Sequence, residues 1–546
     1  MSLLDHAPRF SLDDATGFAE TYFSLRSVAK LLPSERDQNF LLQTERDSFV
    51  LKIANATESR AMLEAQNQAM ERLARRVDFC PRVVPASNGE EIVTVASDDG
   101  AQHFLRLVTY LPGVPLGDVK RRSPELLRDL GFKLGQLTLA LQTFDHPALH
   151  RDFHWDLARG LDILQKFSPL LTPDLRGLIE TFRAQFERQA APLLSSLRTS
   201  IVYNDANDYN LLMGGGDDLY SRNQTVVGLI DFGDMLHSYT VSDLAVAIAY
   251  AILEEPDPLA AAAHIVRGYH AAFPLHETEL AALFGLVTLR LCMSVCIGAD
   301  QQARQPENDY LGISQSSIRN TLPKLATIHP RFAEMIFREA CGLTPSPSSD
   351  ALTHWLSSPS RTFASLLGPS TSLRTSPERL PETSVVLDLS VSSPLLHSDP
   401  SLNDAAHLTP RIEQTLREAA KEINREEREA REDIQDSFAP LAGLAVNQVI
   451  GIGRYDEARY LYASPAFATG PRPTDEYRAL HLGLDLFAPA GTPVYAPLEG
   501  RVVAFADNAA AQDYGPVIVL EHEAGELKFY TLYGHLSRDS LAGLSL

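Results

Sequence analysis

Cysteine is scarce in this sequence. The 546 residues include four cysteines, Cys80, Cys292, Cys296 and Cys341. So few cysteines in so long a chain cannot build the disulfide framework of a small secreted domain, and we expect a reducing compartment. Cys292 and Cys296 would share one face of a helix. Because no second Cys/His pair lies nearby, we interpret them as small buried hydrophobic residues rather than as a metal site.

Basic residues and long apolar runs are also in short supply. The chain has 48 Lys and Arg against 70 Asp and Glu, a net charge of -22. Nucleic-acid backbones and anionic membranes bind cationic surfaces, so neither is expected as the main partner. The most apolar stretches, 244–253 and 284–298, are shorter than the roughly twenty residues of a membrane-spanning helix. The amino terminus lacks the features of a signal peptide, and we expect a cytoplasmic protein.

The pattern of apolar residues divides the first part of the chain into two lobes. Short apolar runs between turn residues predict a strand-rich lobe over residues 18–110, with one helix at 58–76. Helical periodicity then predicts a larger lobe over residues 116–343. The Pro and Gly residues between the two are typical of a hinge.

The remainder of the chain has three further patterns. Residues 344–410 are rich in Ser and Pro, which predicts a linker, with one isolated strand at 385–391. Opposite charges alternate over 411–436 without an apolar heptad, which favours a solvated connector helix over a coiled coil. Residues 451–546 alternate strands with Pro and Gly turns. The predicted fold class is therefore α+β, with a two-lobed domain followed by a linker and a β-rich domain.

The most informative residues follow two apolar, strand-like segments. The first segment ends in Asp205, Asn210 lies five residues later, and the second segment ends in Asp231-Phe-Gly. Phosphoryl transfer needs a carboxylate that orients the attacking hydroxyl and receives its proton, and hard oxygen ligands that hold Mg²⁺ on the nucleotide phosphates. Asp205 matches the first requirement, and Asn210 and Asp231 match the second.

Two charged residues lie upstream in the strand-rich lobe. Lys52 falls within the apolar segment 50–53, and Glu64 follows twelve residues later on the predicted helix. A lysine in an apolar strand needs a counter-charge, so we predict a phosphate-clamping ion pair between Lys52 and Glu64. Each residue alone also fits an ordinary structural role, such as a turn cap for Asp205, but their order along the chain favours the catalytic interpretation.

In these motifs the sequence resembles the aminoglycoside phosphotransferase and choline kinase-like family of small-molecule kinases, and within it the hydroxylysine kinase branch. The resemblance spans residues 18–343 and rests on five segments: 34–42, 50–53, 203–210, 230–234 and 242–245. It implies a bilobal, protein-kinase-like fold that transfers the γ-phosphoryl of ATP or GTP, with Mg²⁺, to the hydroxyl of a small amine-bearing molecule. Hydroxylysine, homoserine and ethanolamine are examples of such acceptors.

The resemblance also implies residue roles. Asp205 would be the catalytic base, Asn210 and Asp231 would bind Mg²⁺, Lys52 would contact the nucleotide phosphates, and Glu64 would position Lys52. The sequence departs from the family at Tyr203, where a histidine is usual. It also has no glycine between positions 17 and 89, so a polar turn that starts at Ser34 would cover the phosphates.

Two segments near these motifs admit more than one interpretation. Residues 150–156 concentrate histidine, aspartate and one of the two tryptophans, and either line the acceptor pocket or begin a helix that Asp156 caps. Asp243 is predicted to cap the apolar helix that follows it. A kinase-fold binding module without catalysis remains an alternative, which Tyr203 would favour and the complete Asp205, Asn210 and Asp231 set opposes.

A second constellation lies near the carboxyl terminus. His481, Asp485 and the later His535 resemble the lysostaphin-type zinc endopeptidases, whose β-rich fold is the duplicated hybrid motif. The resemblance implies that His481 and Asp485 are zinc ligands and that His535 is catalytic. Catalytic zinc needs three protein ligands, and the His-x-His that supplies the third in that family is absent, with His522 not at the matching position. We therefore expect weak zinc binding and no peptidase activity, although a zinc endopeptidase is the alternative function.

The two resemblances together indicate a longer arrangement. Kinase-like modules of this branch are found joined to such a peptidase-like module and to a class III aminotransferase that uses pyridoxal phosphate. No aminotransferase module is present in this chain. We therefore expect an incomplete peptidase-like domain, from a fragment or a truncated gene model, and a nucleotide and a small amine-bearing alcohol as the partners.

Overall fold

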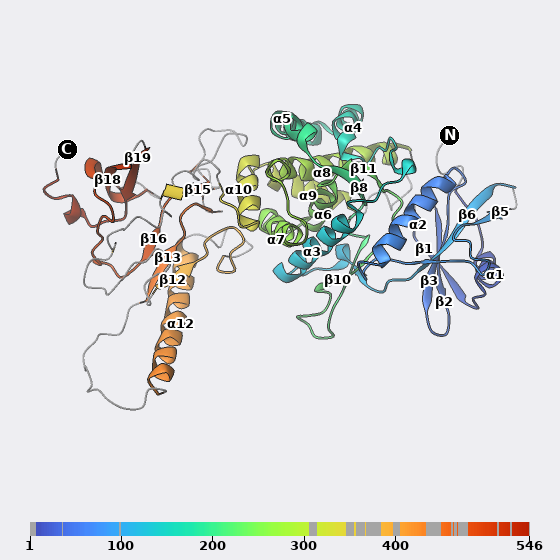
Figure 1. The fold of residues 1–546 in the computed structure, drawn as a ribbon. Helices are drawn as coiled ribbons and strands as arrows, with labels where there is room; N and C mark the ends of the chain where they lie inside the picture. The colour runs from blue at the N-terminus through green and yellow to red at the C-terminus, as the bar shows by residue number, and fades with distance from the viewer. Residues whose placement is uncertain are drawn as a thin grey trace. The chain divides into compact units, whose positions relative to one another are not determined.

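The computed structural model divides the chain into two compact units, and each is described by itself (Figure 1). The first unit comprises residues 1–343 together with 471–476, and the second comprises 344–470 and 477–546. The structure describes residues 7–544 apart from 35–36, 98–99, 305–313, 346–353, 356–365, 367–383, 397–404, 433–448, 460–461, 463–466, 468–478, 510–512 and 525–526.

The first lobe of unit 1 is an antiparallel sheet with one helix on each face. The strands are β1 (Val28–Leu32), β2 (Gln38–Gln43), β3 (Ser48–Ile53), β4 (Val83–Val84), β5 (Val93–Ala96) and β6 (Gln102–Thr109), and the helices are α1 (Leu12–Phe23) and α2 (Arg60–Ala74). The strand order is β1-β2-β3-β6-β4, with β5 also paired to β6. The strand-rich lobe and its single long helix at 58–76 are thus found where the sequence predicted them.

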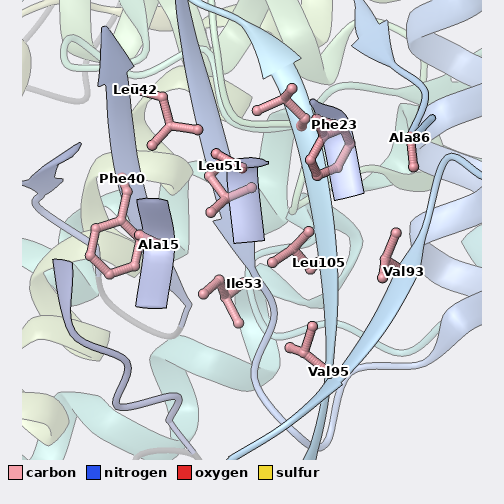
Figure 2. Packing of buried hydrophobic residues seen from close by; sticks show 12 residues of the cluster. Ala15, Phe23, Phe40, Leu42, Leu51, Ile53, Ala86, Val93, Val95 and Leu105 are labelled. Carbon is pink, nitrogen blue, oxygen red and sulfur yellow. The ribbon is translucent and has the colours of Figure 1, made fainter. Parts of the chain in front are cut away.

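Alternation along the strands separates the two faces of this sheet. Leu51 and Ile53 of β3 and Leu105 of β6 point to one face, where they pack against α1 (Figure 2). Leu107 of β6 belongs to the same buried cluster. Successive strand residues point to opposite faces, so Lys52 and its cross-strand partner Arg106 face away from this apolar core. Burial of each large apolar side chain contributes about 1.5–3 kcal/mol, which fixes the register that places Lys52.

The second lobe of unit 1 is mainly helical. Its helices are α3 (Pro124–Leu141), α4 (Gly160–Phe167), α5 (Pro173–Gln189), α6 (Ser242–Ala251), α7 (Pro258–Ala272), α8 (Glu277–Arg304), α9 (Gln315–Leu325) and α10 (Pro330–Ala340). Its short strands are β7 (Val114–Pro115), β8 (Thr199–Val202), β9 (Leu211–Gly214), β10 (Thr225–Leu229) and β11 (Leu236–Tyr239). They form a β10-β9-β7 sheet and a β11-β8 pair, and the loops of these sheets carry the predicted site residues.

Helix α8 lies in the middle of this lobe. It has 28 residues, so the apolar stretch predicted at 284–298 belongs to a much longer helix. By length and composition α8 could cross a membrane, but 89% of its most apolar 18-residue window is buried inside the protein. This is the behaviour of a core helix, as the sequence predicted for both apolar stretches.

The described residues of the second unit form three small groups of strands and one long helix. The first sheet joins β12 (Ser384–Leu387), β13 (Ile450–Gly453) and β16 (Asp485–Phe487), the second joins β14 (Glu457–Ala458) to β15 (Leu480–His481), and the third joins β17 (Arg501–Asn508), β18 (Gly515–Ala524) and β19 (Leu527–Tyr533). The helix is α12 (Ala405–Glu432). This unit is rich in strands, as the sequence predicted for residues 451–546.

The segment predicted as a linker contributes to the core of this unit. The strand expected to be isolated, β12, pairs in parallel with β13 more than sixty residues later. Helix α12 begins at Ala405 rather than at residue 411, and its Ile412 is buried beside Leu387 and Leu389. The alternating charges form the solvated face of this helix, as predicted. Its apolar face is too short to show a heptad repeat in the sequence, and it packs on β12.

Glycines allow helices α3 and α7 to approach each other closely. A Cβ atom added at Gly131 of α3 would lie 1.9 Å from the carbonyl oxygen of Ile265, and one added at Gly268 of α7 would lie 2.0 Å from the carbonyl oxygen of Arg128. Neither backbone oxygen can move away without separating the helices. The contact between α3 and α7 therefore depends on the absence of a side chain at both positions.

This packing leads to a stability prediction. Gly131→Ala or Gly268→Ala should lower the free energy of unfolding of unit 1 by about 1–3 kcal/mol, because the added methyl group overpacks the interface. Gly177→Ala in α5 is the matched control, since its Cβ would meet nothing within 4 Å and alanine favours the helix by up to about 1 kcal/mol. Urea unfolding curves measure the difference. A Gly131→Ala protein as stable as Gly177→Ala would contradict the packing argument.

Candidate active site

Lys52 and Asp231 bring the two lobes of unit 1 together. Lys52 lies in β3 of the first lobe, and its side chain is 16% exposed. Its Nζ donates a hydrogen bond of 3.2 Å to Oδ1 of Asp231, which follows β10 in the second lobe. Asp231 has a φ of 62°, in the left-handed region that non-glycine residues seldom adopt. A strained backbone held at this point is typical of functional sites.

Glu64 does not take the place that was predicted for it. Its Oε1 accepts a hydrogen bond of 3.0 Å from Nε of Arg60, one turn earlier on α2, and its side chain is 46% exposed. Lys52 pairs with Asp231 instead of Glu64. An i, i+4 partner on the same helix is always within reach, whereas a pair between β3 and α2 depends on how the helix is set against the sheet.

Ser34 lies in the turn between β1 and β2, as predicted. Its hydroxyl accepts a hydrogen bond of 3.3 Å from the side-chain amide of Asn39. The two residues that follow Ser34 in this turn lie outside the described residues. The polar turn expected to cover the nucleotide phosphates is thus described at Ser34 and from Asp37 onwards.

Arg106 adds a buried positive charge that the sequence interpretation missed. It is the cross-strand neighbour of Lys52 and is 4% exposed. Its guanidinium donates to Oε1 of Gln66 at 2.8 Å and to Oδ1 of Asn67 at 2.9 Å, both on α2. Burial lowers the pKa of Arg106, and the nearby Asp37 opposes that shift. The available signal was an arginine inside an apolar alternating strand, the same pattern that singled out Lys52.

Asp205 and Asn210 meet in the loop after β8. Oδ2 of Asp205 accepts a hydrogen bond of 2.7 Å from Nδ2 of Asn210, and Oδ1 accepts one of 2.9 Å from Nδ2 of Asn207. The backbone N–H of Ile230 donates to the carbonyl oxygen of Asn210 at 3.0 Å, which places this loop against the end of β10. The structure thus brings Asp205, Asn210 and Asp231 into one region, as their spacing predicted.

Asp243 accepts hydrogen bonds from the backbone of this loop rather than capping α6. Helix α6 has Val241 as its N-cap residue and no side-chain cap. The carboxylate of Asp243 accepts hydrogen bonds from the backbone N–H of Tyr203 at 3.1 Å and of Asn204 at 2.6 Å. Asn204 has a φ of 68°, so the two backbone donors converge on one carboxylate. The prediction of a helix cap was wrong because a loop some forty residues earlier in the chain supplies the donors.

Tyr203 ties the same loop to the strand that precedes Asp231. Its phenol is buried and donates a short hydrogen bond to the carbonyl oxygen of Ile230. Burial raises the pKa of Tyr203 well above its usual value, and the charge of Asp205 raises it further. The phenol therefore stays protonated and acts as a donor. Tyr203 thus joins the two loops that carry Asp205 and Asp231.

Three carboxylates make the site strongly negative. Burial raises the pKa of Asp205 well above its usual value, and the charges of Asp234 and Asp231 raise it further. The guanidinium of Arg290, whose Nη2 lies 3.5 Å from Oδ1 of Asp205, acts in the opposite direction. Three carboxylates against the two cations Lys52 and Arg290 leave a negative charge at a partly buried site, which is suited to a divalent metal ion and to positively charged ligands.

The oxygen donors of the site fit Mg²⁺. Asn210 uses its amide nitrogen to contact Asp205, so its carbonyl oxygen is the atom left to face a cation. Asp231 offers a carboxylate on the neighbouring loop. Mg²⁺ is usually held by one or two protein oxygens and by substrate phosphates rather than by a full protein cage. The described residues hold no group of three His, Cys, Asp or Glu side chains suited to a metal, and Mg²⁺ would not need such a group at this site.

Residues 150–156 contact the loop that carries Asp231. The carboxylate of Asp156 accepts a hydrogen bond of 3.0 Å from the N–H of Ala158 and caps the short helix at Leu157–Arg159. The helix-start interpretation therefore holds for this residue. Arg151 in turn donates to the carbonyl oxygen of Gly233 at 2.8 Å.

In the second unit, His481 and Asp485 lie close together. Nε2 of His481 is 3.4 Å from Oδ1 of Asp485, and Nη1 of Arg459 is 2.6 Å from Oδ2 of the same carboxylate. Burial alone would raise the pKa of Asp485, but the hydrogen bond with His481 and the charge of Arg459 outweigh it and lower the pKa to about 2. The carboxylate already has a cation, and Arg459 is a partner that the sequence interpretation missed.

His522 and His535 do not form a metal-binding group with His481 and Asp485 among the described residues. Both ring nitrogens of His522 are engaged, one 2.9 Å from the carbonyl oxygen of Glu499 and the other 2.7 Å from Oγ1 of Thr531. His535 follows β19 with a φ of 56°. A catalytic zinc takes three protein ligands, and the described residues supply two with Arg459 bound to one of them. The residues described here do not fit zinc, and we derive no zinc chemistry from them.

The matches to known proteins fall in the same two parts of the chain, the first unit and the end of the second. Residues 28–282 match the phosphotransferase enzyme family, and residues 479–542 match peptidase family M23. The hydroxylysine kinase of Danio rerio is 32% identical over 333 residues, which cover 58% of this chain and 91% of that protein. The homoserine kinase of Xanthobacter autotrophicus is 27% identical over 263 residues, which cover 48% of this chain and 76% of that protein.

A solved structure is also similar. The microcompartment-associated aminopropanol kinase covers 62% of this chain and 100% of its own, with 18% sequence identity and a TM-score of 0.45. The resemblances predicted from the motifs are confirmed, as are the kinase-like fold and a phosphotransferase activity toward a hydroxyl group. The kinase-like unit carries Lys52, Asp205, Asn210 and Asp231 on two lobes, and the chain belongs to the phosphotransferase enzyme family.

Proposed function

We propose that this protein transfers the γ-phosphoryl group of Mg²⁺-bound ATP or GTP to the hydroxyl of a hydroxylated amino acid or an amino alcohol. The observation that carries the proposal is the contact of Asp205 with Asn210 beside Asp231. The related hydroxylysine and homoserine kinases act on hydroxylated amino acids by name, and the aminopropanol kinase on an amino alcohol. The negative site suits an acceptor that carries an ammonium group.

Each residue has a distinct part in the proposed transfer. Asp205 accepts a hydrogen bond from the acceptor's hydroxyl and receives its proton as the oxygen attacks the γ-phosphorus. A new P–O bond forms to the acceptor, and the bond between the γ-phosphorus and the bridging oxygen breaks to release the nucleoside diphosphate. Lys52 contacts the phosphates, and Asn210 and Asp231 hold Mg²⁺. When bound, Mg²⁺ neutralises charge on the transferring group.

Lys52 and Asp231 face the same region of the site, with Nζ of Lys52 3.2 Å from Oδ1 of Asp231. Lys52 would contact the nucleotide phosphates there, and Asp231 would hold Mg²⁺ together with Asn210. Ser34 lines the phosphate-covering turn. We leave Glu64 out of this machinery because it pairs with Arg60.

The proposed kinase activity belongs to one part of the chain. We assign the kinase domain to residues 18–343, with lobes at 18–110 and 116–343, in a cytoplasmic enzyme whose four cysteines are free thiols. Within residues 344–410, β12 and the start of α12 belong to the second unit, α12 extends to Glu432, and residues 451–546 form the peptidase-like domain.

The first prediction concerns the catalytic base. Asp205→Asn should lower kcat by about 10³-fold or more, because an amide cannot take the hydroxyl proton, while nucleotide affinity stays within a few-fold of wild type. Asp174→Asn is the matched control, since Asp174 is an exposed residue in the first turn of α5, outside the proposed site. The assay supplies Mg²⁺-ATP or Mg²⁺-GTP with hydroxylysine, homoserine, ethanolamine or choline. Equal turnover by wild type and Asp205→Asn would remove the assignment.

The second prediction separates Lys52 from Glu64. Lys52→Met should lower kcat/KM for the nucleotide by about 10²-fold, because a charge-assisted phosphate contact is lost. Glu64→Gln should stay within about threefold of wild type, because Glu64 pairs with Arg60 on the helix surface. Steady-state kinetics with varied nucleotide measure both. A loss for Glu64→Gln as large as that for Lys52→Met would restore the ion pair predicted from the sequence.

The third prediction concerns zinc in the second unit, where the match to peptidase family M23 favours a second candidate function. We expect this chain to retain much less than one zinc ion per molecule after dialysis, because Arg459 already neutralises Asp485. Metal analysis by mass spectrometry measures the content. One zinc per chain that is lost in His481→Ala would instead support a zinc endopeptidase.

A further inference from the structure

Arg290 is a buried cation in the middle of helix α8. Its side chain is 2% exposed, although α8 is otherwise apolar at this level. Burial of a guanidinium costs free energy unless the group is paired and hydrogen-bonded. Removal of one of its partners destabilises the fold. The contacts of Arg290 should therefore show what it does for the fold or for the reaction.

The guanidinium of Arg290 contacts two loops at once. Nη1 donates a hydrogen bond of 3.0 Å to the carbonyl oxygen of Trp155, and Nη2 lies 3.5 Å from Oδ1 of Asp205. The charged group also lies over the indole ring of Trp155, 4.5 Å from its centre, with the ring of Tyr250 at 5.8 Å. Two aromatic rings and a carbonyl oxygen fix the plane of the guanidinium, so its second nitrogen has a defined position.

Arg290 differs from the other groups that hold Asp205. Asn207 and Asn210 contact the carboxylate from within its own loop and move with that loop. Arg290 comes from α8, whose residues around it are buried in the core of the lobe. A loop carboxylate that is fixed only by its own loop can turn as a unit. A contact from a core helix ties its orientation to the rest of the lobe.

We propose that Arg290 is a positioning residue for phosphoryl transfer, which orients the carboxylate of Asp205 and fixes it relative to residues 150–156. The inference rests on the proposed function, because it concerns the reaction in which Asp205 receives the hydroxyl proton. Catalysis by a base depends on its geometry to within about 1 Å, and misplacement on that scale costs about 10²-fold in rate. Arg290 touches neither the nucleotide-binding residue Lys52 nor the acceptor in this scheme.

The test compares substitutions of Arg290 with a matched one elsewhere. Arg290→Met should lower kcat about 10²-fold and leave the KM for the nucleotide within about threefold. Arg290→Lys should recover at least a tenth of the wild-type kcat, since the charge near Asp205 is kept while the fork is lost. The control is Arg338→Met. Arg338 is also buried, and its partner Glu277 lies thirteen residues before Arg290 on α8, about 20 Å along the helix.

A double variant shows whether Arg290 acts through Asp205. In an Asp205→Asn background, Arg290→Met should lower the residual rate by less than threefold, because the group that it positions has already lost its function. Support requires a kcat loss in Arg290→Met that Arg338→Met does not share and that largely disappears in the double variant.

Three results would overturn the inference. They are an Arg290→Met protein with kcat within threefold of wild type, a loss of equal size in Arg338→Met, and a full additional loss in the double variant. If Arg290→Met does not fold, Arg290→Lys with and without Asp205→Asn decides in the same way. Failure of the wild type to phosphorylate any acceptor of the panel would refute the proposed function itself, which is a different result from an active wild type that tolerates Arg290→Met.

Discussion

The site depends on a carboxylate, that of Asp205, which is only 19% exposed and still has to work as a base. Burial and the charges of Asp231 and Asp234 disfavour the ionised form of Asp205, and a protonated Asp205 could not accept a proton from the acceptor. Hydrogen bonds from Asn207 and Asn210 and the guanidinium of Arg290 oppose this shift. A magnesium nucleotide would add further positive charge. The arrangement of cations around the carboxylates is therefore the condition for the proposed reaction.

Two buried residues set the loops on which this arrangement rests. Asp243 accepts the backbone N–H groups of Tyr203 and Asn204, and the phenol of Tyr203 reaches the carbonyl oxygen next to Asp231. The chain of contacts runs from the core helix α6 through the Asp205 loop to the Asp231 loop. The tyrosine at this position therefore makes a structural link between the two loops. This weakens the interpretation of Tyr203 as a sign of lost activity.

The sequence was sufficient for the fold class and for the grouping of Asp205, Asn210 and Asp231, because Asp205 and Asp231 each follow a strand with a clear apolar pattern and Asn210 lies five residues after Asp205. Lys52 could be singled out because it is a charged residue inside such a strand. The ion-pair partner of Glu64 could not be predicted from the sequence, since the choice between Arg60 and Lys52 depends on how α2 packs against the sheet. The pairing of β12 with β13 could not be predicted either, because their residues are more than sixty positions apart. Arg290 interrupts an apolar helix, which singles it out in the sequence, but its partners could not be predicted because they lie in loops more than eighty residues earlier.

The central claim is that the γ-phosphoryl group passes to a hydroxyl of a small amine-bearing acceptor. The most direct test is ³¹P NMR of the product formed from Mg²⁺-ATP or Mg²⁺-GTP with hydroxylysine, homoserine, ethanolamine and choline in turn. We predict a phosphomonoester resonance coupled to the carbon-bound protons beside the former hydroxyl of at least one acceptor, together with the nucleoside diphosphate. Unchanged nucleotide, or release of inorganic phosphate alone with every acceptor, would contradict the account.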